Sequence, residues 1–403
     1  MKRDPFLTAN GIGILSQEPN KAHPPAFLSE DIAAGVQAFH ETVPDYERTP
    51  LRELPALAKK LGLGRIFVKD ESKRFGLNAF KGLGGIYAVS RIICERLGLE
   101  GEGLSFSEIC TAENRQKLKD TVFITATDGN HGKGVAWAAG KFGCRAHVYT
   151  PKGTVESRVK AIEALGAEEV LVTDCYYDDT VRMAKKRAEE NGWVLVQDTA
   201  WEGYEKIPTY IVQGYTTLAR EAAEQLVEAG VSAPDVLFLQ AGVGAFAGSA
   251  AGYFANRYGK AFPKTILAEP AEAACLFASA VENDGLSHAS SGSCETVMAG
   301  LNCAEPCLIT YPTLRDLPVG YASCPDFVTE RGMNILGNPE GNDPVVISGE
   351  SGAVGMGLLL ELMQNPELAA YKERFGLTED AVILLISTEG DTDPDHYRAV
   401  AGK

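Results

Sequence analysis

The sequence lacks the features of a membrane protein and of a nucleic-acid-binding protein. No stretch approaches the roughly 18 uninterrupted apolar residues that a membrane-spanning helix needs, and no apolar run follows the N-terminal segment 1–5. Basic residues are outnumbered 38 to 54, which gives a net charge of −16 and argues against nucleic acid or an anionic membrane surface as a partner. We therefore expect a cytoplasmic protein that binds neither.

Cysteine usage predicts neither a metal site nor a disulfide framework. The nine cysteines are an odd number and are scattered along the chain, so buried thiols are expected. Cys303 and Cys307 lie four residues apart, but a second pair and a nearby histidine are missing, which argues against zinc. The sequence leaves open a disulfide within residues 275–307.

The length of 403 residues and the apolar content of 45% allow two domains with sizeable cores. Short apolar or β-branched runs alternate with longer amphipathic stretches, which is typical of a parallel α/β sheet. We predict a small α/β domain, residues 85–195, inserted into a large domain formed by residues 1–84 and 196–403. Residues 1–50 look polar and surface-wrapping, and 100–119 look like an insertion. Strands are predicted at 66–69, 121–125, 146–150, 170–173, 194–197, 236–240, 265–268, 345–347 and 382–386.

Lys81 is the first candidate for chemistry. It lies in the run N-A-F-K-G-L-G-G at residues 78–85, between a strand-like and a helix-like stretch. Desolvation at an apolar helix start weakens the preference of an amine for its charged form and makes it a nucleophile towards a carbonyl carbon. The hypothesis is a Schiff-base lysine, and the alternative is a solvated surface lysine. Two glycine-bearing loops favour the first.

Each of these loops follows a predicted strand and precedes a helix. The first is T-D-G-N-H-G at 127–132, where exposed amides favour an anion such as a carboxylate, although the loop alone also fits a helix cap. In it, Asn130 can bind a ring hydroxyl or phenolate and Asp128 is a potential base. The second is A-G-V-G-A-F-A-G at 241–248, which can cradle a phosphate. Its third glycine falls one place late for a dinucleotide fingerprint, and no P-loop is present.

In combination, these motifs resemble a known family. N-A-F-K-G, T-D-G-N-H-G, A-G-V-G-A-F-A-G, E-S-G-A at 350–353 and S-T-E-G-D at 387–391 occur in the order found in the fold type II pyridoxal-phosphate enzymes, which include threonine and serine dehydratases and cysteine synthases. The resemblance covers nearly the whole chain from about residue 49. Asp128 and the run Q-D-T-A-W at 197–201 are similar to the diaminopropionate ammonia-lyases.

The resemblance implies an architecture and a cofactor. The fold would have two open, twisted, mainly parallel sheets with helices on both faces, and pyridoxal 5′-phosphate between a large and a small domain. Lys81 would form the Schiff base, Phe80 would wall one side of the ring and Asn130 would bind its 3-oxygen. Thr388 stands where the family keeps a hydroxyl on the pyridine nitrogen. The phosphate would be bound by the amides of Gly242, Val243, Gly244 and Ala245. The family usually forms homodimers.

Asp128 is the substitution that bears on substrate. In the commoner dehydratase pattern, Ser and a small neutral residue stand where this chain has Thr127 and Asp128. A carboxylate beside the cofactor costs desolvation unless the substrate carries a second ammonium. Asp198, after the strand 194–197, is another acid placed to reach the site, although a helix or turn cap is the alternative. The predicted substrate contacts are Thr127, Asp128, Gly129, His131 and Asp198.

The predicted function is the α,β-elimination of 2,3-diaminopropionate, in both D and L forms, to pyruvate and two ammonia. Lys81 would remove the α-proton of one enantiomer and Asp128 that of the other, with Asp198 as a further catalytic acid. One alternative is a serine or threonine dehydratase of the same fold, against which Asp128 argues. The other is a non-catalytic protein that binds pyridoxal phosphate or a nucleotide. The joint presence of the lysine, the asparagine loop and the phosphate loop argues against it.

Overall fold

The computed structural model describes residues 6–20, 24–99, 103–127 and 129–402. Its described residues form two compact units: unit 1 comprises Met1–Glu30, Arg48–Lys73 and Leu218–Lys403, and unit 2 comprises Asp31–Glu47 and Arg74–Thr217. The predicted domain limits at 84/85 and 195/196 both fall inside unit 2, and the boundary at 217/218 falls inside a long helix. The predicted division into a large domain and a small inserted domain at these limits therefore stays a prediction.

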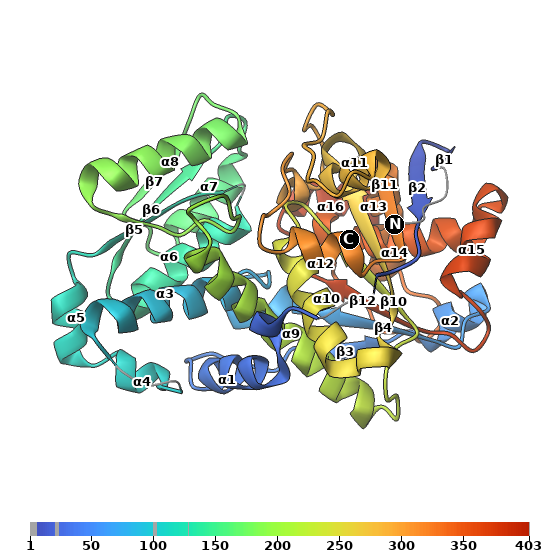
Figure 1. Ribbon diagram of the computed structural model, residues 1–403, viewed down its shortest axis with the longest axis horizontal. Helices are drawn as coiled ribbons and strands as arrows, with labels where there is room; N and C mark the ends of the chain where they lie inside the picture. Colours follow the sequence, from blue (N-terminus) through green and yellow to red (C-terminus); the bar gives the residue numbers. More distant parts are fainter. Residues whose placement is uncertain (1–5, 21–23, 100–102, 128, 403) are drawn as a thin grey trace. The chain divides into compact units, whose positions relative to one another are not determined.

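Unit 1 is built on an eight-stranded sheet (Figure 1). Its five central strands are parallel, and the edge strands β1, β2 and β3 pair antiparallel. In sheet order the strands are β1 (Leu7–Ala9), β2 (Ile12–Ser16), β11 (Gly320–Cys324), β10 (Lys264–Pro270), β9 (Val236–Gln240), β12 (Val382–Ser387), β4 (Arg65–Asp70) and β3 (Leu51–Glu53). Its helices include α2 (Pro55–Leu61), α10 (Ala245–Tyr258), α11 (Cys275–Glu282), α12 (Tyr311–Asp316), α13 (Asp326–Gly337), α14 (Glu350–Gln364), α15 (Ala369–Phe375) and α16 (Pro394–Ala401).

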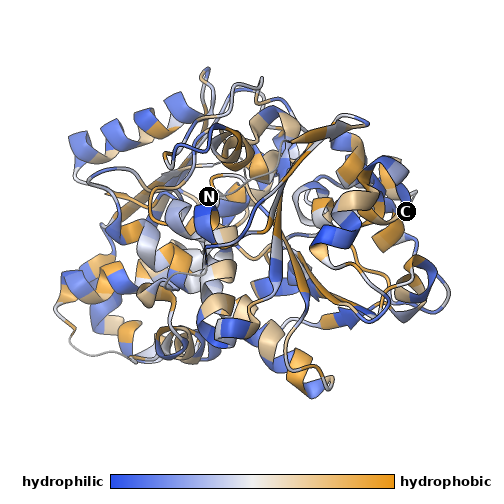
Figure 2. Ribbon diagram, turned by 45° about the vertical axis from the view of Figure 1, so that its right-hand side comes forward, coloured by the Kyte–Doolittle hydropathy of each residue, from blue (hydrophilic) through white to orange (hydrophobic). Residues whose placement is uncertain are grey.

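The core of unit 1 follows from its apolar strands. V-L-F-L-Q of β9 is buried throughout, as expected of a central parallel strand covered on both faces. Figure 2 shows the hydrophobic residues along the strands, whereas the peripheral helices alternate between hydrophobic and polar faces. The helices α13 and α14 pack so closely that a Cβ on Gly357 would lie 1.7 Å from the carbonyl oxygen of Val328. Glycine is required at that contact.

Unit 2 contains a four-stranded parallel sheet with α8 on one side and α3 and α6 on the other (Figure 1). In sheet order the strands are β7 (Glu169–Val172), β6 (Arg145–Thr150), β5 (Val122–Ala126) and β8 (Val194–Leu195). The helices are α1 (Glu30–Glu41), α3 (Gly82–Leu97), α4 (Phe106–Ile109), α5 (Ala112–Leu118), α6 (Asn130–Phe142), α7 (Glu156–Glu163), α8 (Tyr177–Asn191) and the first half of α9 (Lys206–Glu228).

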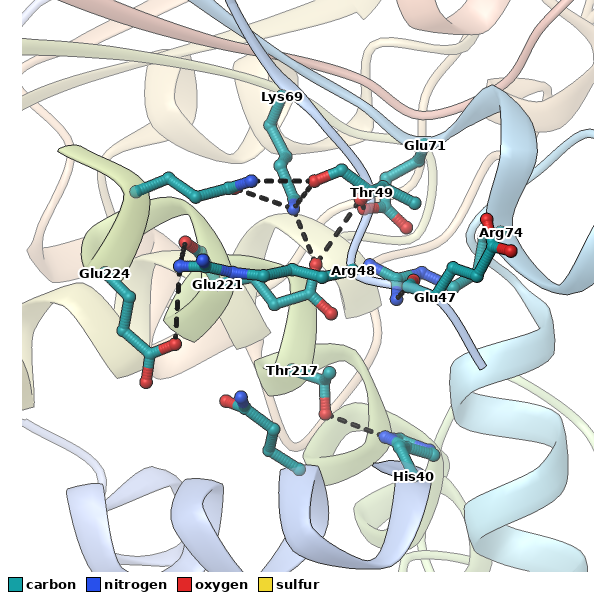
Figure 3. Close-up of polar contacts among 12 residues, drawn as sticks. His40, Glu47, Arg48, Thr49, Lys69, Glu71, Arg74, Thr217, Glu221 and Glu224 are labelled. Atoms are coloured by element: carbon teal, nitrogen blue, oxygen red, sulfur yellow. Dashed lines mark hydrogen bonds and ion pairs between the residues drawn. The ribbon is translucent and has the colours of Figure 1, made fainter. Parts of the chain in front are cut away.

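A buried histidine joins three helices of unit 2. Nδ1 of His40 in α1 lies 2.7 Å from Oγ1 of Thr217 (Figure 3). Its Nε2 lies 3.0 Å from the carbonyl oxygen of Leu83. A carbonyl oxygen can only accept, so Nε2 is the protonated nitrogen and Nδ1 accepts from the threonine hydroxyl. This contact ties α1 and α9 to the first turn of α3, which begins next to Lys81.

Two expectations about the fold were wrong. Residues 1–50 do not simply wrap the surface, because Ile12–Ser16 is a fully buried strand that pairs with β11, and Glu30–Glu41 is a helix. The predicted strand 345–347 is irregular, with Val345 and Ile347 exposed at 47% and 42%. In the 100–119 segment, the described residues form the capped helices α4 and α5.

Candidate active site

Lys81 lies at the start of α3 in unit 2, where its side chain is 18% exposed. Its Nζ donates a hydrogen bond to Oδ2 of Asp198, whose side chain is 7% exposed. The residues beside the lysine are small because α6 packs directly on them. A Cβ on Gly134 would lie 2.9 Å from the carbonyl oxygen of Lys81, and one on Gly85 would lie 2.8 Å from that of Gly134. The glycines of this run therefore bring the lysine against α6.

Asp198 is held in place by the end of the sheet in unit 2. The side chain of Gln197 accepts a hydrogen bond from the Ala126 amide at 3.0 Å and donates one to the Ala126 carbonyl at 3.0 Å. Burial raises the pKa of Asp198, but the neighbouring His131 and Lys81 lower it by a larger amount, to about 2. Asp198 is therefore a buried, ionised carboxylate paired with the amine of Lys81, and not a helix cap.

His131 stands on the other side of Asp198. Its Nε2 lies 2.8 Å from the carbonyl oxygen of Val196, which fixes the proton on Nε2 because a carbonyl only accepts. Its Nδ1 lies 3.7 Å from Oδ2 of Asp198. Burial lowers the pKa of His131 more than Asp198 raises it, so the ring keeps its neutral form to a lower pH than an ordinary histidine.

The loop T-D-G-N-H-G is shaped by its threonine. Oγ1 of Thr127 accepts hydrogen bonds from the amides of Gly129 at 2.9 Å and Gly132 at 3.0 Å. Gly129 has φ +148°, which favours glycine, and Asn130 begins α6 directly after it. Asp128 lies outside the described residues. The loop thus leads directly into the first turn of α6, which contains His131.

Phe80 packs beside the lysine as an aromatic wall. It is 6% exposed, and its ring centroid lies 4.7 Å from that of Tyr215. Nζ of Lys81 lies 5.7 Å from the centre of the Phe80 ring. Unit 2 therefore brings five of the predicted residues into one cluster: Phe80, Lys81, Thr127, His131 and Asp198.

The predicted phosphate loop is in unit 1, between β9 and α10. Gly244 is the N-cap of α10 with φ +90°, and a Cβ there would lie 2.6 Å from Cδ1 of Leu314. A Cβ on Gly242 would lie 3.0 Å from the backbone of Leu301. The first amides of a helix have no acceptor within the helix and carry its positive dipole end. The run from Gly242 to Ala245 is therefore a tight backbone cradle that fits a phosphate.

Thr388 follows β12 at the same edge of the sheet in unit 1. It is 3% exposed, and its Oγ1 lies 2.9 Å from Nε2 of Gln240, the last residue of β9. The two C-terminal motifs also meet here, since the amide of Ser351 donates to Oε1 of Glu389 at 2.9 Å. A buried hydroxyl and a glycine cradle are the groups that a pyridine nitrogen and a phosphate require, so the residues fit pyridoxal phosphate.

Three residues that contact or adjoin predicted site residues were missed from sequence: Gln197 and Tyr215 in unit 2, and Gln240 in unit 1. Gln197 and Gln240 share one signal, because each is a buried polar residue at the carboxyl end of an apolar strand. Tyr215 lies within a long amphipathic helix and carries no such signal.

Within the part of the chain that the structure describes, the cysteines form neither a disulfide nor a metal site. Burial raises the pKa of the Cys275 thiol well above its usual range. Among the described residues, no three His, Cys, Asp or Glu side chains are grouped to hold a metal ion. None of the described helices combines the length and apolar character needed to cross a bilayer.

Comparison with known proteins places these features in a family. Residues 43–377 match the family of pyridoxal-phosphate-dependent enzymes. The chain is 50% identical to the diaminopropionate ammonia-lyase of Salmonella typhimurium over 376 residues, which is 93% of each protein. The structure is similar to that of the Escherichia coli diaminopropionate ammonia-lyase in complex with D-serine, with a TM-score of 0.90, 47% identity and coverage of 97% and 96% of the two chains. The same E. coli enzyme with an aminoacrylate-pyridoxal-phosphate azomethine intermediate gives a TM-score of 0.89 at 46% identity, with coverage of 98% and 97%.

The fold and the site together define a fold type II pyridoxal-phosphate enzyme. The cradle of Gly242–Ala245 and the lysine at the start of α3 are the local features that agree with this class. The chain belongs to the family of the diaminopropionate ammonia-lyases.

Proposed function

We propose that the protein converts 2,3-diaminopropionate and one water into pyruvate and two ammonia by α,β-elimination. The observation that carries this proposal is the buried Asp198 carboxylate paired with the Lys81 amine, in a chain 50% identical to a diaminopropionate ammonia-lyase along 93% of its length. An ionised carboxylate at this depth suits a substrate that brings a second ammonium. Serine and threonine, the substrates of the dehydratases of the same fold, carry no such ammonium at the β carbon.

Each predicted residue has a task towards the cofactor. The amides from Gly242 to Ala245 would bind the phosphate, and Lys81 would hold the aldehyde carbon through Nζ. Asn130 would bind the 3-oxygen, and Phe80 would cover one ring face. When bound, pyridoxal phosphate withdraws the electron pair left at the α carbon of the substrate.

Thr388 limits how strongly that electron pair is withdrawn. A neutral hydroxyl cannot keep a proton on the pyridine nitrogen as a carboxylate would, so the ring is a weaker electron sink. A weaker sink favours rapid loss of a β leaving group over transamination.

Proton removal at the α carbon is assigned to two bases. Nζ of Lys81 would take the proton of one enantiomer, and the carboxylate of Asp128 that of the other. The buried Asp198 carboxylate would bind the β-ammonium of the substrate until it leaves as ammonia. Thr127, Gly129 and His131 would complete the substrate pocket at the start of α6. Use of both enantiomers rests on this pair of bases.

The first test is pyruvate release from D- and L-2,3-diaminopropionate and from D- and L-serine in parallel. We expect fast release from both diamine enantiomers, and turnover of serine alone would move the function to a dehydratase. Asp128→Asn should abolish turnover of one enantiomer and leave the other measurable. Equal loss on both would contradict the two-base assignment.

The working form is inferred to be a cytoplasmic homodimer. Nine cysteines that the structure does not join in disulfides suit a reducing compartment, and the family usually forms homodimers. Light scattering on the purified protein would test the dimer, and a monomeric mass would refute it.

A further inference from the structure

We propose that Gln240 is a positioning residue that directs the hydroxyl proton of Thr388 towards the cofactor's ring nitrogen. The proposal rests on the proposed function, because it assumes that Thr388 faces that nitrogen. Gln240 ends β9 and Thr388 directly follows β12, and these two strands are parallel neighbours in the sheet of unit 1. Both residues are buried, at 1% and 3% exposure.

The orientation of the Gln240 amide is fixed by its second partner. Its Nε2 lies 2.8 Å from the carbonyl oxygen of Ile386 and 2.9 Å from Oγ1 of Thr388. A carbonyl oxygen has no proton to give, so the atom facing it is the amide nitrogen and not the amide oxygen. The two protons of that nitrogen are then shared between Ile386 and Thr388. Oγ1 of Thr388 is therefore an acceptor towards Gln240.

This contact leaves the hydroxyl proton of Thr388 for another partner. Within the part of the chain that the structure describes, the bond from Gln240 is the one that Thr388 Oγ1 makes. A buried hydroxyl that keeps its proton unbonded is unfavourable, so an acceptor from outside the chain is expected. An unprotonated pyridine nitrogen is such an acceptor. A protonated one is a donor and would leave the hydroxyl proton unsatisfied.

Gln240 thereby selects the unprotonated ring. Without the glutamine, both lone pairs of Oγ1 are open, and the freed carbonyl of Ile386 can compete for the hydroxyl proton. The ring nitrogen then loses a fixed donor. The glutamine does not touch the reacting atoms, so its effect passes through Thr388 alone.

The test compares Gln240→Met with wild type by two measurements that do not depend on turnover. The first is the affinity of the apoprotein for pyridoxal phosphate and for its 1-deaza analogue, which has C–H in place of the ring nitrogen. Wild type should prefer pyridoxal phosphate by about tenfold, the value of one hydrogen bond. In Gln240→Met this preference should fall towards that of Thr388→Val. The second is the ¹⁵N shift of ring-labelled cofactor, which should leave the hydrogen-bonded, unprotonated region.

Gln240→Glu provides a second route if Gln240→Met does not fold. An ionised carboxylate can only accept, so it would take the hydroxyl proton away from the ring, whereas its protonated form can again donate. The ¹⁵N shift should therefore depend on pH in this variant and not in wild type. An unchanged preference in Gln240→Met, or a shift without pH dependence in Gln240→Glu, would overturn the role of Gln240.

Thr388→Val separates this inference from the proposed site. If Thr388→Val changes the preference and the ¹⁵N shift but Gln240→Met does not, only the positioning role fails. If Thr388→Val also matches wild type, Thr388 does not face the ring nitrogen, and the site assignment fails with it. Pyruvate release from diaminopropionate tests the reaction itself independently of both.

Discussion

Lys69 of unit 1 is fully buried, and its replacement by methionine should destabilise that unit strongly. Its Nζ lies 2.5 Å from Oε2 of Glu221, 2.7 Å from the carbonyl oxygen of Thr49 and 3.0 Å from Oε1 of Gln225 (Figure 3). The side chains of Lys69 and Glu221 are both 0% exposed. Lys69→Met preserves most of the side-chain volume, so the main effect is the loss of the ammonium that pairs with the buried Glu221 carboxylate.

The expected cost is about 3 to 5 kcal/mol, the usual loss when one partner of a buried ion pair is removed. Replacing both residues, as in Lys69→Met with Glu221→Leu, removes the buried carboxylate as well, and such replacements are often neutral. The double variant should therefore be more stable than the single one. With an m-value of about 3 kcal/mol/M in urea, the single substitution lowers the midpoint by about 1 M or more.

The assay is urea unfolding of the apoprotein followed by far-ultraviolet circular dichroism and by tryptophan fluorescence. The three tryptophans, Trp137, Trp193 and Trp201, all lie in unit 2, so fluorescence follows that unit. Loss of Lys69 should move the dichroism transition first. The matched control is Lys60→Met, because Lys60 pairs with Glu340 in unit 1 with side chains 52% and 32% exposed, and should cost about 1 kcal/mol or less. A double variant no more stable than Lys69→Met would refute the reasoning.

Three further predictions concern the site. Asp198→Asn removes the charge paired with Lys81 and should lower kcat/KM on diaminopropionate roughly a hundredfold with an unchanged dichroism spectrum, whereas near-normal kinetics would remove Asp198 from the site. Gly244→Ala places a Cβ 2.6 Å from a leucine methyl at φ +90° and should weaken cofactor binding to the apoprotein at least about tenfold, while Gly62→Ala, at φ +69° in open space, should cost about 1 kcal/mol of stability and leave cofactor affinity unchanged. The pKa of His131 is lowered in the folded protein, so as the pH falls below the ordinary value of 6.5 the unfolded chain binds a proton more readily than the folded chain. The free energy of unfolding should therefore decrease as the pH falls below 6.5. His131→Asn should reduce this decrease, measured by urea unfolding at one pH above 6.5 and at several below it.

The central strands could be predicted because their apolar composition indicates that they are buried. Runs such as V-L-F-L-Q of β9 and V-I-L-L-I of β12 are apolar along their whole length, as strands covered on both faces must be. I-G-I-L-S at 12–16 is equally buried, but its state depends on pairing with β11, about three hundred residues later. V-V-I at 345–347 has the composition of a strand but is irregular, and the amide of its middle residue donates a hydrogen bond to the carbonyl of Leu336. Composition alone cannot tell these two cases apart.

The shape of the two candidate loops could be predicted where it depends on glycine. Gly244 and Gly129 are required by positive φ, and glycine is visible in a sequence. Side-chain roles were harder, because Thr127 turns out to shape its own loop through two amides. The Lys81–Asp198 contact joins residues 117 positions apart, and a spacing of that length carries no local signal.

The two buried glutamines explain how the strand ends hold the proposed site in each unit. The regular pairing of β8 with β5 ends at Leu195, and the side chain of Gln197 then bonds both the amide and the carbonyl of Ala126, as a further pair of backbone groups would. In unit 1, the pairing of β9 with β12 ends at Leu237, and Gln240 bonds the carbonyl of Ile386. A side-chain amide carries a donor and an acceptor, so it can satisfy backbone groups where strands diverge and no ladder remains. Gln197 adjoins Asp198, and Gln240 adjoins the glycine cradle while touching Thr388. At the carboxyl edge of each sheet, a glutamine side chain therefore takes over hydrogen bonds to backbone groups directly beside predicted site residues.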